Sequence, residues 1–205
     1  MALACIALLL GLAHLLNAKP LDCEPLVPET LDNATISKAL GKWFYIVGAS
    51  QYKPHQKEME VLKNAYYYFF LGKHNHVLQV TQVMRVNESC IVDKDIYVTI
   101  DRSNSTITIK GPHENGTAQI LHSNFEDSLI MYHIQNVEKG ISLSARSQNV
   151  SKEQMEEFKA RAACLGFTED DMYYTTAEAI CPLEDNDGDK KHPSKVEPTV
   201  QPTAE

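Results

Sequence analysis

Apolar and polar residues alternate in short runs along most of the chain between residues 41 and 146. A period of two residues is typical of β-strands that bury one face. The segments between the runs are rich in Gly, Asn, Asp and Ser, which favour the tight turns of antiparallel hairpins. We therefore predict eight strands, joined mostly by short turns, over residues 41–47, 61–71, 77–86, 90–100, 106–110, 117–121, 128–134 and 141–146.

The segment after residue 150 has helical spacing instead. Ser151 and Gln154 have the spacing of a capping box, and Gly166 provides a stop. The apolar residues between them recur on one helical face: Met155, Phe158, Ala162 and Leu165. We predict one helix here that packs against the sheet, followed by a short ninth strand over residues 172–176. The proline-rich arm over 19–40 is predicted to be irregular, with a short helical turn at 37–40.

The first predicted strand holds the only tryptophan, Trp43, two residues after Gly41. Strict alternation would place Trp43, Tyr45 and Val47 on one face of this strand and the residues between them on the other. Small closed barrels fill or cap their interior with such side chains, so Trp43 would close one end of a barrel. The alternative is an ordinary buried tryptophan in a β core.

The two ends of the chain differ from the middle. Residues 1–18 carry no Asp, Glu, Lys or Arg, and their apolar run is shorter than a membrane span, which is typical of a signal peptide. Residues 183–205 are acidic, contain prolines and lack aromatics, which is typical of a disordered tail. We predict a signal peptide at 1–18, one domain at 19–182, a tail at 183–205, and a secreted protein without a membrane span.

The formal net charge is −8. An acidic surface disfavours binding to nucleic acid or to anionic membranes. We therefore expect no nucleic-acid partner.

Removal of the signal peptide takes Cys5 away and leaves Cys23, Cys90, Cys164 and Cys181. Four cysteines in an oxidising compartment indicate two disulfides, with three possible pairings. Their spacing does not match the paired ligands of a zinc site.

Five Asn-X-Ser/Thr triplets fall where turns are predicted, which marks these positions as surface sites for N-glycosylation. Their asparagines are Asn33, Asn87, Asn104, Asn115 and Asn149.

The order of these features resembles the lipocalin family. The resemblance is carried by the segment Gly41-Lys42-Trp43-Phe44-Tyr45-Ile46, the spacing of the four cysteines, the triplet at Asn33, and the segment from Lys152 to Phe158 running on to Cys164 and Leu165. It covers nearly the whole chain from the predicted cleavage point to Leu183. It implies an all-β fold: an eight-stranded antiparallel up-and-down barrel with one C-terminal α-helix and a short ninth strand.

The resemblance also implies disulfides Cys23–Cys164 and Cys90–Cys181. A basic residue that follows the eighth strand covers the tryptophan in this family, and Arg146 holds that place here. Arg146 is therefore expected to be structural, together with Gly41 and Trp43.

By position in the family, Tyr45, Gln82, Ser142 and Ser144 are expected to face an apolar cavity. The implied function is secreted binding and transport of small lipophilic molecules such as steroids, of the plasma-transport, acute-phase type. A human member of the family has an acidic residue where this chain has Gln82. A glutamine supplies no opposite charge for an amine, so we expect neutral ligands to be preferred.

Other functions are less well supported by the sequence. The cysteines are expected in disulfides and no catalytic triad can be recognised in the sequence, so we expect that the protein is not an enzyme. We also expect no cofactor and a monomeric protein. His74 and His76 lie in a predicted turn and are expected to be exposed rather than metal ligands, and the remaining histidines are scattered. The alternative function is a glycan-presenting interaction protein that engages lectins or cell-surface receptors through its sugars.

Overall fold

The computed structural model describes residues 23, 26–74, 76–112, 115–135, 137–176 and 179–183. The predicted signal peptide and all but the first residue of the predicted tail lie outside these residues, so the predicted domain boundaries stay predictions.

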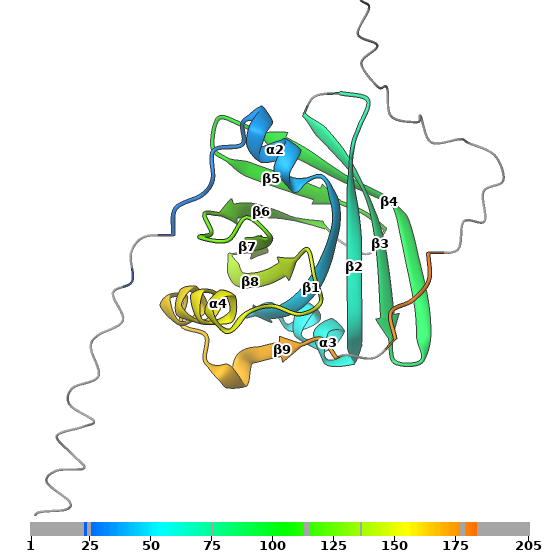
Figure 1. Cartoon of the computed structure of the whole chain (residues 1–205), viewed down its shortest axis with the longest axis vertical. Coiled ribbons are helices and arrows are strands. Elements are labelled where there is room, and N and C mark those ends of the chain that lie inside the picture. The colour runs from blue at the N-terminus through cyan, green and yellow to red at the C-terminus, as the bar shows by residue number, and fades with distance from the viewer. Residues whose placement is uncertain are drawn as a thin grey trace, which may run out of the picture.

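The described chain forms a closed antiparallel barrel with one extra strand (Figure 1). Consecutive strands pair from β2 to β8, and β1 then pairs with both β8 and β2, which closes the ring. The ninth strand pairs with β1 at Val47–Ala49. The predicted fold class is therefore confirmed. The strands are β1 (Gly41–Ser50), β2 (Leu62–Leu71), β3 (Val77–Val86), β4 (Ser89–Asp101), β5 (Thr106–Lys110), β6 (Asn115–Leu121), β7 (Ser128–Gln135), β8 (Glu138–Ala145) and β9 (Met172–Tyr174).

Among the described residues, three α-helices accompany the barrel: α2 (Asn33–Ala39), α3 (Lys53–Val61) and α4 (Lys152–Cys164). Helix α4 begins at the predicted capping box, with Ser151 and Gln154 bonded reciprocally. Helix α2 extends the predicted helical turn towards its N-terminus. Helix α3 was not predicted, because its sequence has no apolar stripe of the kind that a buried helix face produces. The structure agrees, since no residue of α3 is buried. A short 3₁₀-helix, Glu169–Asp171, precedes β9.

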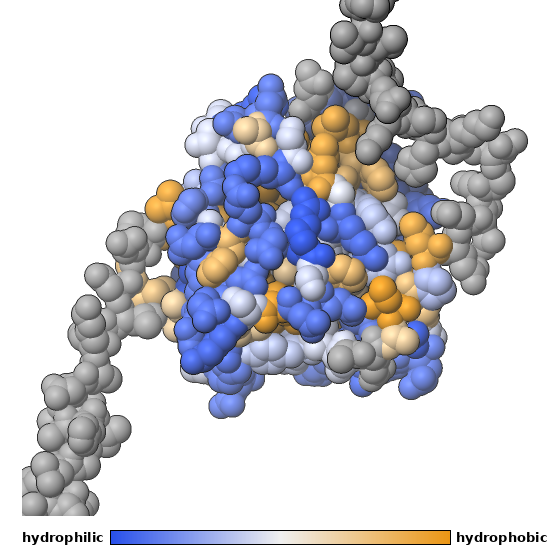
Figure 2. All heavy atoms as spheres, in the orientation of Figure 1, coloured by the Kyte–Doolittle hydropathy of each residue, from blue (hydrophilic) through white to orange (hydrophobic). Residues whose placement is uncertain are grey.

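The apolar side chains form two main layers on either side of the barrel wall. One cluster fills the closed part of the interior and includes Trp43, Phe69 and Ile107. The other lies outside the wall, where Phe158 and Ala162 of α4 pack against β1, β7 and β8. Figure 2 shows that the outer face carrying α4 is mainly hydrophilic, with separate apolar patches.

A β-bulge in β1 corrects one expectation about side-chain direction. The register against β8 shifts between Tyr45 and Val47, so one residue is extra on β1. Trp43 and Tyr45 belong to the inner cluster as predicted, but Val47 belongs to the outer cluster and is fully buried there. The prediction that Val47 shares their face is wrong, because the bulge reverses the alternation.

The end of the barrel beside α2 is closed by Trp43. Its side chain is 2% exposed, and its Nε1 donates a hydrogen bond to the Ala39 carbonyl at 2.8 Å. The Arg146 guanidinium lies over the indole, with its carbon 3.8 Å from the ring centroid. Gly41 has φ +89°, a conformation that favours glycine, and it lies against the same guanidinium.

Arg146 also joins the segments around this plug. Its two terminal nitrogens donate to the carbonyl oxygens of Lys42 at 2.7 Å, Lys38 at 2.6 Å and Leu40 at 2.8 Å. These acceptors lie at the end of α2 and the start of β1, so one side chain holds the entry to β1 in place.

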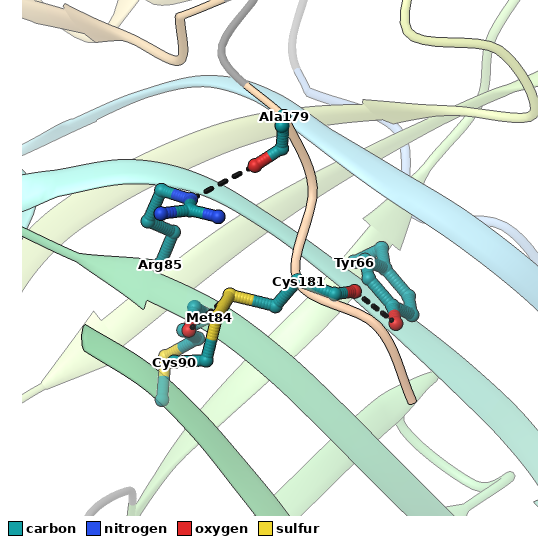
Figure 3. The surroundings of a disulfide bond; sticks show 6 residues. All are labelled: Tyr66, Met84, Arg85, Cys90, Ala179 and Cys181. Atoms are coloured by element: carbon teal, nitrogen blue, oxygen red, sulfur yellow. Dashed lines mark hydrogen bonds between the residues drawn. A yellow bond between two sulfur atoms is a disulfide. The ribbon is translucent and has the colours of Figure 1, made fainter. Parts of the chain in front are cut away.

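The two disulfides link the chain ends to the barrel, in the pairing that the family resemblance implies. Cys23–Cys164 ties the N-terminal arm to the end of α4. Cys90–Cys181 ties the start of β4 to the C-terminal segment 179–183 (Figure 3). Tyr66 donates its hydroxyl hydrogen to the Cys181 carbonyl at 2.8 Å, and Arg85 Nε donates to the Ala179 carbonyl at 2.8 Å. This segment is therefore fixed across the outside of β2 and β3.

We expect Arg146→Met to lower the free energy of unfolding by about 2 kcal/mol, because it removes a cation–π contact and charge-assisted hydrogen bonds. Arg146→Lys should recover only part of the loss, since a lysine lacks the planar fork. Lys110→Met, which removes an exposed positive charge from the end of β5, should change stability by less than about 0.5 kcal/mol. Urea denaturation followed by circular dichroism measures all three. Equal stability of the Arg146→Met variant and the wild type would contradict the role of this contact.

Candidate ligand-binding cavity

A cavity of about 460 Å³ occupies the barrel next to α3. Its wall is formed by α3 and by every barrel strand except β6. The volume lies in the range of small-molecule sites, roughly 300–1,000 Å³. Residues at the ends of strands, including Ser50, Val86 and Ile91, line it, so it lies at the end of the barrel opposite the Trp43 plug.

The deep part of the cavity is apolar. It is lined by Phe69 on β2, Val80 on β3, Val98 on β4 and Ile107 on β5, all of which point inward with the core cluster. Tyr67 also points inward, while its neighbours Tyr66 and Tyr68 lie on the outer face, where the Lys42 ammonium sits 4.1 Å from the Tyr66 ring centroid. Of these three tyrosines, only Tyr67 occupies volume inside the barrel, and the cavity lies beside its ring.

Three of the four expected cavity residues line the cavity: Tyr45, Gln82 and Ser142. Ser144 does not line it. It is fully buried on the same face of β8, and its hydroxyl is hydrogen-bonded to the Tyr67 hydroxyl. Ser144 therefore belongs to the packed interior around the cavity.

Helix α3 covers part of the mouth. Met59 lines the cavity from this helix, and its Sδ accepts a hydrogen bond from the Tyr45 hydroxyl at 3.4 Å. At its start, Gln56 Nε2 donates to the Ser50 carbonyl at 2.6 Å. The helix has no side-chain N-cap hydrogen bond and no buried residue, so these contacts with β1 hold it over the mouth.

Gly48 makes room for the contact between Tyr45 and α3. A Cβ atom at this position would lie 1.8 Å from the Tyr45 hydroxyl and 3.3 Å from Met59 Sδ. Only a residue without a side chain lets the phenol cross β1 here.

The wall opposite the deep apolar part carries a polar pair that the sequence analysis did not single out. His133 on β7 and Ser142 on β8 both line the cavity, and His133 Nε2 lies 2.9 Å from Ser142 Oγ. Burial, aided by the nearby charge of His55, lowers the pKa of His133 from its ordinary 6.5 to about 4. The ring is half-buried and borders the cavity. With a pKa of about 4, it is neutral near pH 7. Alternation along the predicted strand 128–134 places Leu129, Met131 and His133 on one face and could have identified it.

Two carboxyl groups also line the cavity: Asp93 on β4 and Glu58 on α3. Asp93 is the pairing partner of Gln82 across β3 and β4, so the two side chains are neighbours on the inner face. The expectation that the cavity lacks an opposite charge for an amine rested on Gln82 alone. Because the Asp93 carboxyl group lies next to Gln82, the absence of an opposite charge is no longer a reason to expect that neutral ligands are preferred over amines.

The remaining expected surface sites lie outside the cavity. All five asparagines of the glycosylation triplets are exposed. Asn87 and Asn115 flank the turns at the mouth end, and the other three lie towards the closed end. His74 and His76 stack with ring centroids 5.8 Å apart, and no group of three or more metal-binding side chains occurs among the described residues.

The chain is similar to proteins of a known family. The family model described as the ApoM domain matches residues 26–185. Alpha-1-acid glycoprotein from Oryctolagus cuniculus is 26% identical over 96% of this chain and 100% of its own length. The protein of the same name from Bos taurus is 25% identical over 90% of this chain and 93% of its own length.

Solved structures show the same fold. Lipocalin 12 from rat epididymis superimposes with a TM-score of 0.60 at 16% identity, covering 82% of this chain and 98% of its own. The siderocalin Ex-FABP, described as having dual ligand specificities, superimposes with a TM-score of 0.58 at 15% identity, covering 69% of this chain and 96% of its own.

We expect Gly48→Ala to loosen α3, because the new Cβ displaces the Tyr45 hydroxyl from Met59. Amide hydrogen exchange should become faster in α3 while it stays unchanged in α4. Tyr45→Phe, which removes only the hydroxyl, should produce a weaker effect in the same direction. Unchanged exchange in α3 of Gly48→Ala would show that the contact does not hold the helix.

The lowered pKa of His133 also predicts a pH dependence of stability. Between about pH 6.5 and pH 4 the unfolded chain binds a proton that the folded protein excludes, so the free energy of unfolding falls as pH falls through this window. His133→Gln removes this contribution, so the fall in stability between pH 7 and pH 4.5 should be smaller in the variant than in the wild type. Parallel denaturant titrations at several pH values measure the difference. Equal slopes would mean that His133 has an ordinary pKa.

Proposed function

The chain belongs to the ApoM domain family, and from this we propose that it is a secreted carrier that binds one small lipophilic molecule in the barrel cavity. The observation that carries the proposal is the cavity of about 460 Å³, which has an apolar deep wall and few polar groups near its mouth. Apolar surface with a small number of placed polar groups is the usual composition of a small-molecule site. Transport in plasma and an acute-phase role stay predictions.

Secretion is supported by several independent features. The two disulfides are of the kind that persists in oxidising compartments. The five exposed glycosylation triplets and the uncharged segment 1–18 agree with that location. Within the part of the chain that is described, no helix has both the length and the apolar character of a membrane span.

The preferred ligand charge follows from the cavity wall. Asp93 and Glu58 offer carboxyl groups to a basic ligand, while His133 and Ser142 offer neutral hydrogen-bonding groups. We therefore propose that both neutral and basic lipophilic molecules bind, rather than neutral ones alone.

Catalysis is not part of the proposal. Every cysteine among the described residues is in a disulfide, so none of them supplies a thiolate nucleophile to the cavity. The neutral His133 contacts Ser142, but among the described residues no carboxylate hydrogen-bonds to its imidazole, so the third member of a catalytic triad is missing there.

A second candidate function is presentation of glycans to lectins or receptors. It is supported by the exposure of all five triplet asparagines and their distribution over both ends of the barrel. The two functions respond differently to enzymatic removal of N-glycans: binding of a small ligand should be retained, and binding to a lectin should be lost.

We expect saturable one-to-one binding of a steroid ketone, androstanone, and of an amine on the same skeleton, aminoandrostane. Ile109→Trp should weaken both at least about tenfold, because Ile109 lines the cavity and the larger ring fills it. Thr108→Trp is the matched control, since Thr108 precedes Ile109 and points to the outer face. Isothermal titration calorimetry measures the affinities, and circular dichroism checks the fold. Equal binding by the two variants would place the ligand outside the barrel.

A further inference from the structure

We infer that the His133–Ser142 pair is the hydrogen-bonding anchor of the cavity, and that it favours a lipophilic ligand carrying an uncharged carbonyl or hydroxyl group over the same skeleton without one. The inference rests on the proposed function and adds to it which residues recognise the ligand's polar group.

The geometry places the pair at the cavity surface. His133 pairs across strands with Gly140, and Ser142 lies two residues further along the same face of β8. A Cβ atom at residue 140 would lie 3.5 Å from the His133 Cβ, so the glycine keeps β8 uncrowded beside this side chain. The two polar side chains meet at 2.9 Å while both border the cavity.

Counting hydrogens shows what the pair offers to a ligand. A neutral imidazole carries one N–H, and serine carries one O–H. The contact between them uses one of these hydrogens, whichever tautomer is present. The other remains for donation, either from the free ring nitrogen or from the serine oxygen. A carbonyl or hydroxyl oxygen of the ligand is the natural acceptor for it.

The surroundings keep the pair uncharged. His55 and Glu58 face the cavity from α3, Asp93 from β4, and Tyr45 from β1. Burial and the charge of His55 both disfavour protonation of His133 and hold its pKa at about 4. The pair therefore supplies no charge to attract an anion or repel a cation, and its contribution to affinity depends on hydrogen bonding.

The position of the pair would also orient the ligand. The pair lies on β7 and β8 near the end where α3 covers the mouth, whereas Phe69, Val98 and Ile107 line the deep wall. A ligand with one polar end would direct that end to His133 and its apolar body towards the plug.

The test compares androstanone with androstane, the same skeleton without its ketone, by displacement of the dye ANS. The wild type should bind the ketone about tenfold more tightly than the hydrocarbon, which corresponds to one hydrogen bond. In His133→Phe and in Ser142→Ala this ratio should fall towards one. His133→Gln keeps a donor and an acceptor and should retain most of it. Ile134→Phe changes the next, exposed residue of β7 and should leave the ratio unchanged.

The outcomes separate the two proposals. A wild-type ratio near one, or a ratio that survives in both His133→Phe and Ser142→Ala, would overturn the anchor while cavity binding stands. Failure of both compounds to displace the dye from the wild type would overturn the carrier function itself. If His133→Phe fails to fold, as judged by circular dichroism, Ser142→Ala decides, because it removes only an oxygen from the same pair.

Discussion

Strand β1 must pair on both of its edges, and the rest of the structure depends on this constraint. Residues Gly41–Tyr45 pair with β2 and residues Phe44–Ser50 pair with β8, so β1 closes the sheet by changing neighbours part of the way along. The bulge before Val47 accompanies that change, and the second half of β1 then accepts β9. The same strand carries the plug at its start and leads into α3 at its end. Closed end, outer layer and mouth are therefore set by a single ten-residue segment.

Closure also explains why the interior has two different regions. Near the plug, large inward side chains from most strands meet and pack, and Arg146 fixes the backbone that supports them. Towards α3, inward positions on adjacent strands are small: Gly48, Ser50, Ala65, Gly140 and Ser142. Polar groups are found in this second region because it opens to the mouth. The imidazole of His133 is enclosed enough to stay neutral but still borders open space.

The strands, the capping box of α4 and the place of Trp43 could be predicted because each depends on local alternation or on a few adjacent residues. The bulge could not, since it arises from the registers of β2 and β8 against β1, and it moved Val47 to the outer layer. Helix α3 lacks an apolar stripe and so left no periodic signal. The cavity residues were predicted from family position, which identified Gln82 but not its cross-strand neighbour Asp93, because that pairing requires the β3–β4 register.

A hollow barrel gives up packing that a filled core would have, at a cost that grows with the empty volume. The structure offsets this loss outside the cavity rather than within it. Phe158 and Ala162 bury a second apolar layer against β1 and β8, and the two disulfides tie both chain ends to the wall. Because these contacts lie on the outer face, they stabilise the barrel without taking interior volume. The inner face near the mouth is then free to carry small and polar side chains, which is the condition that a ligand site requires.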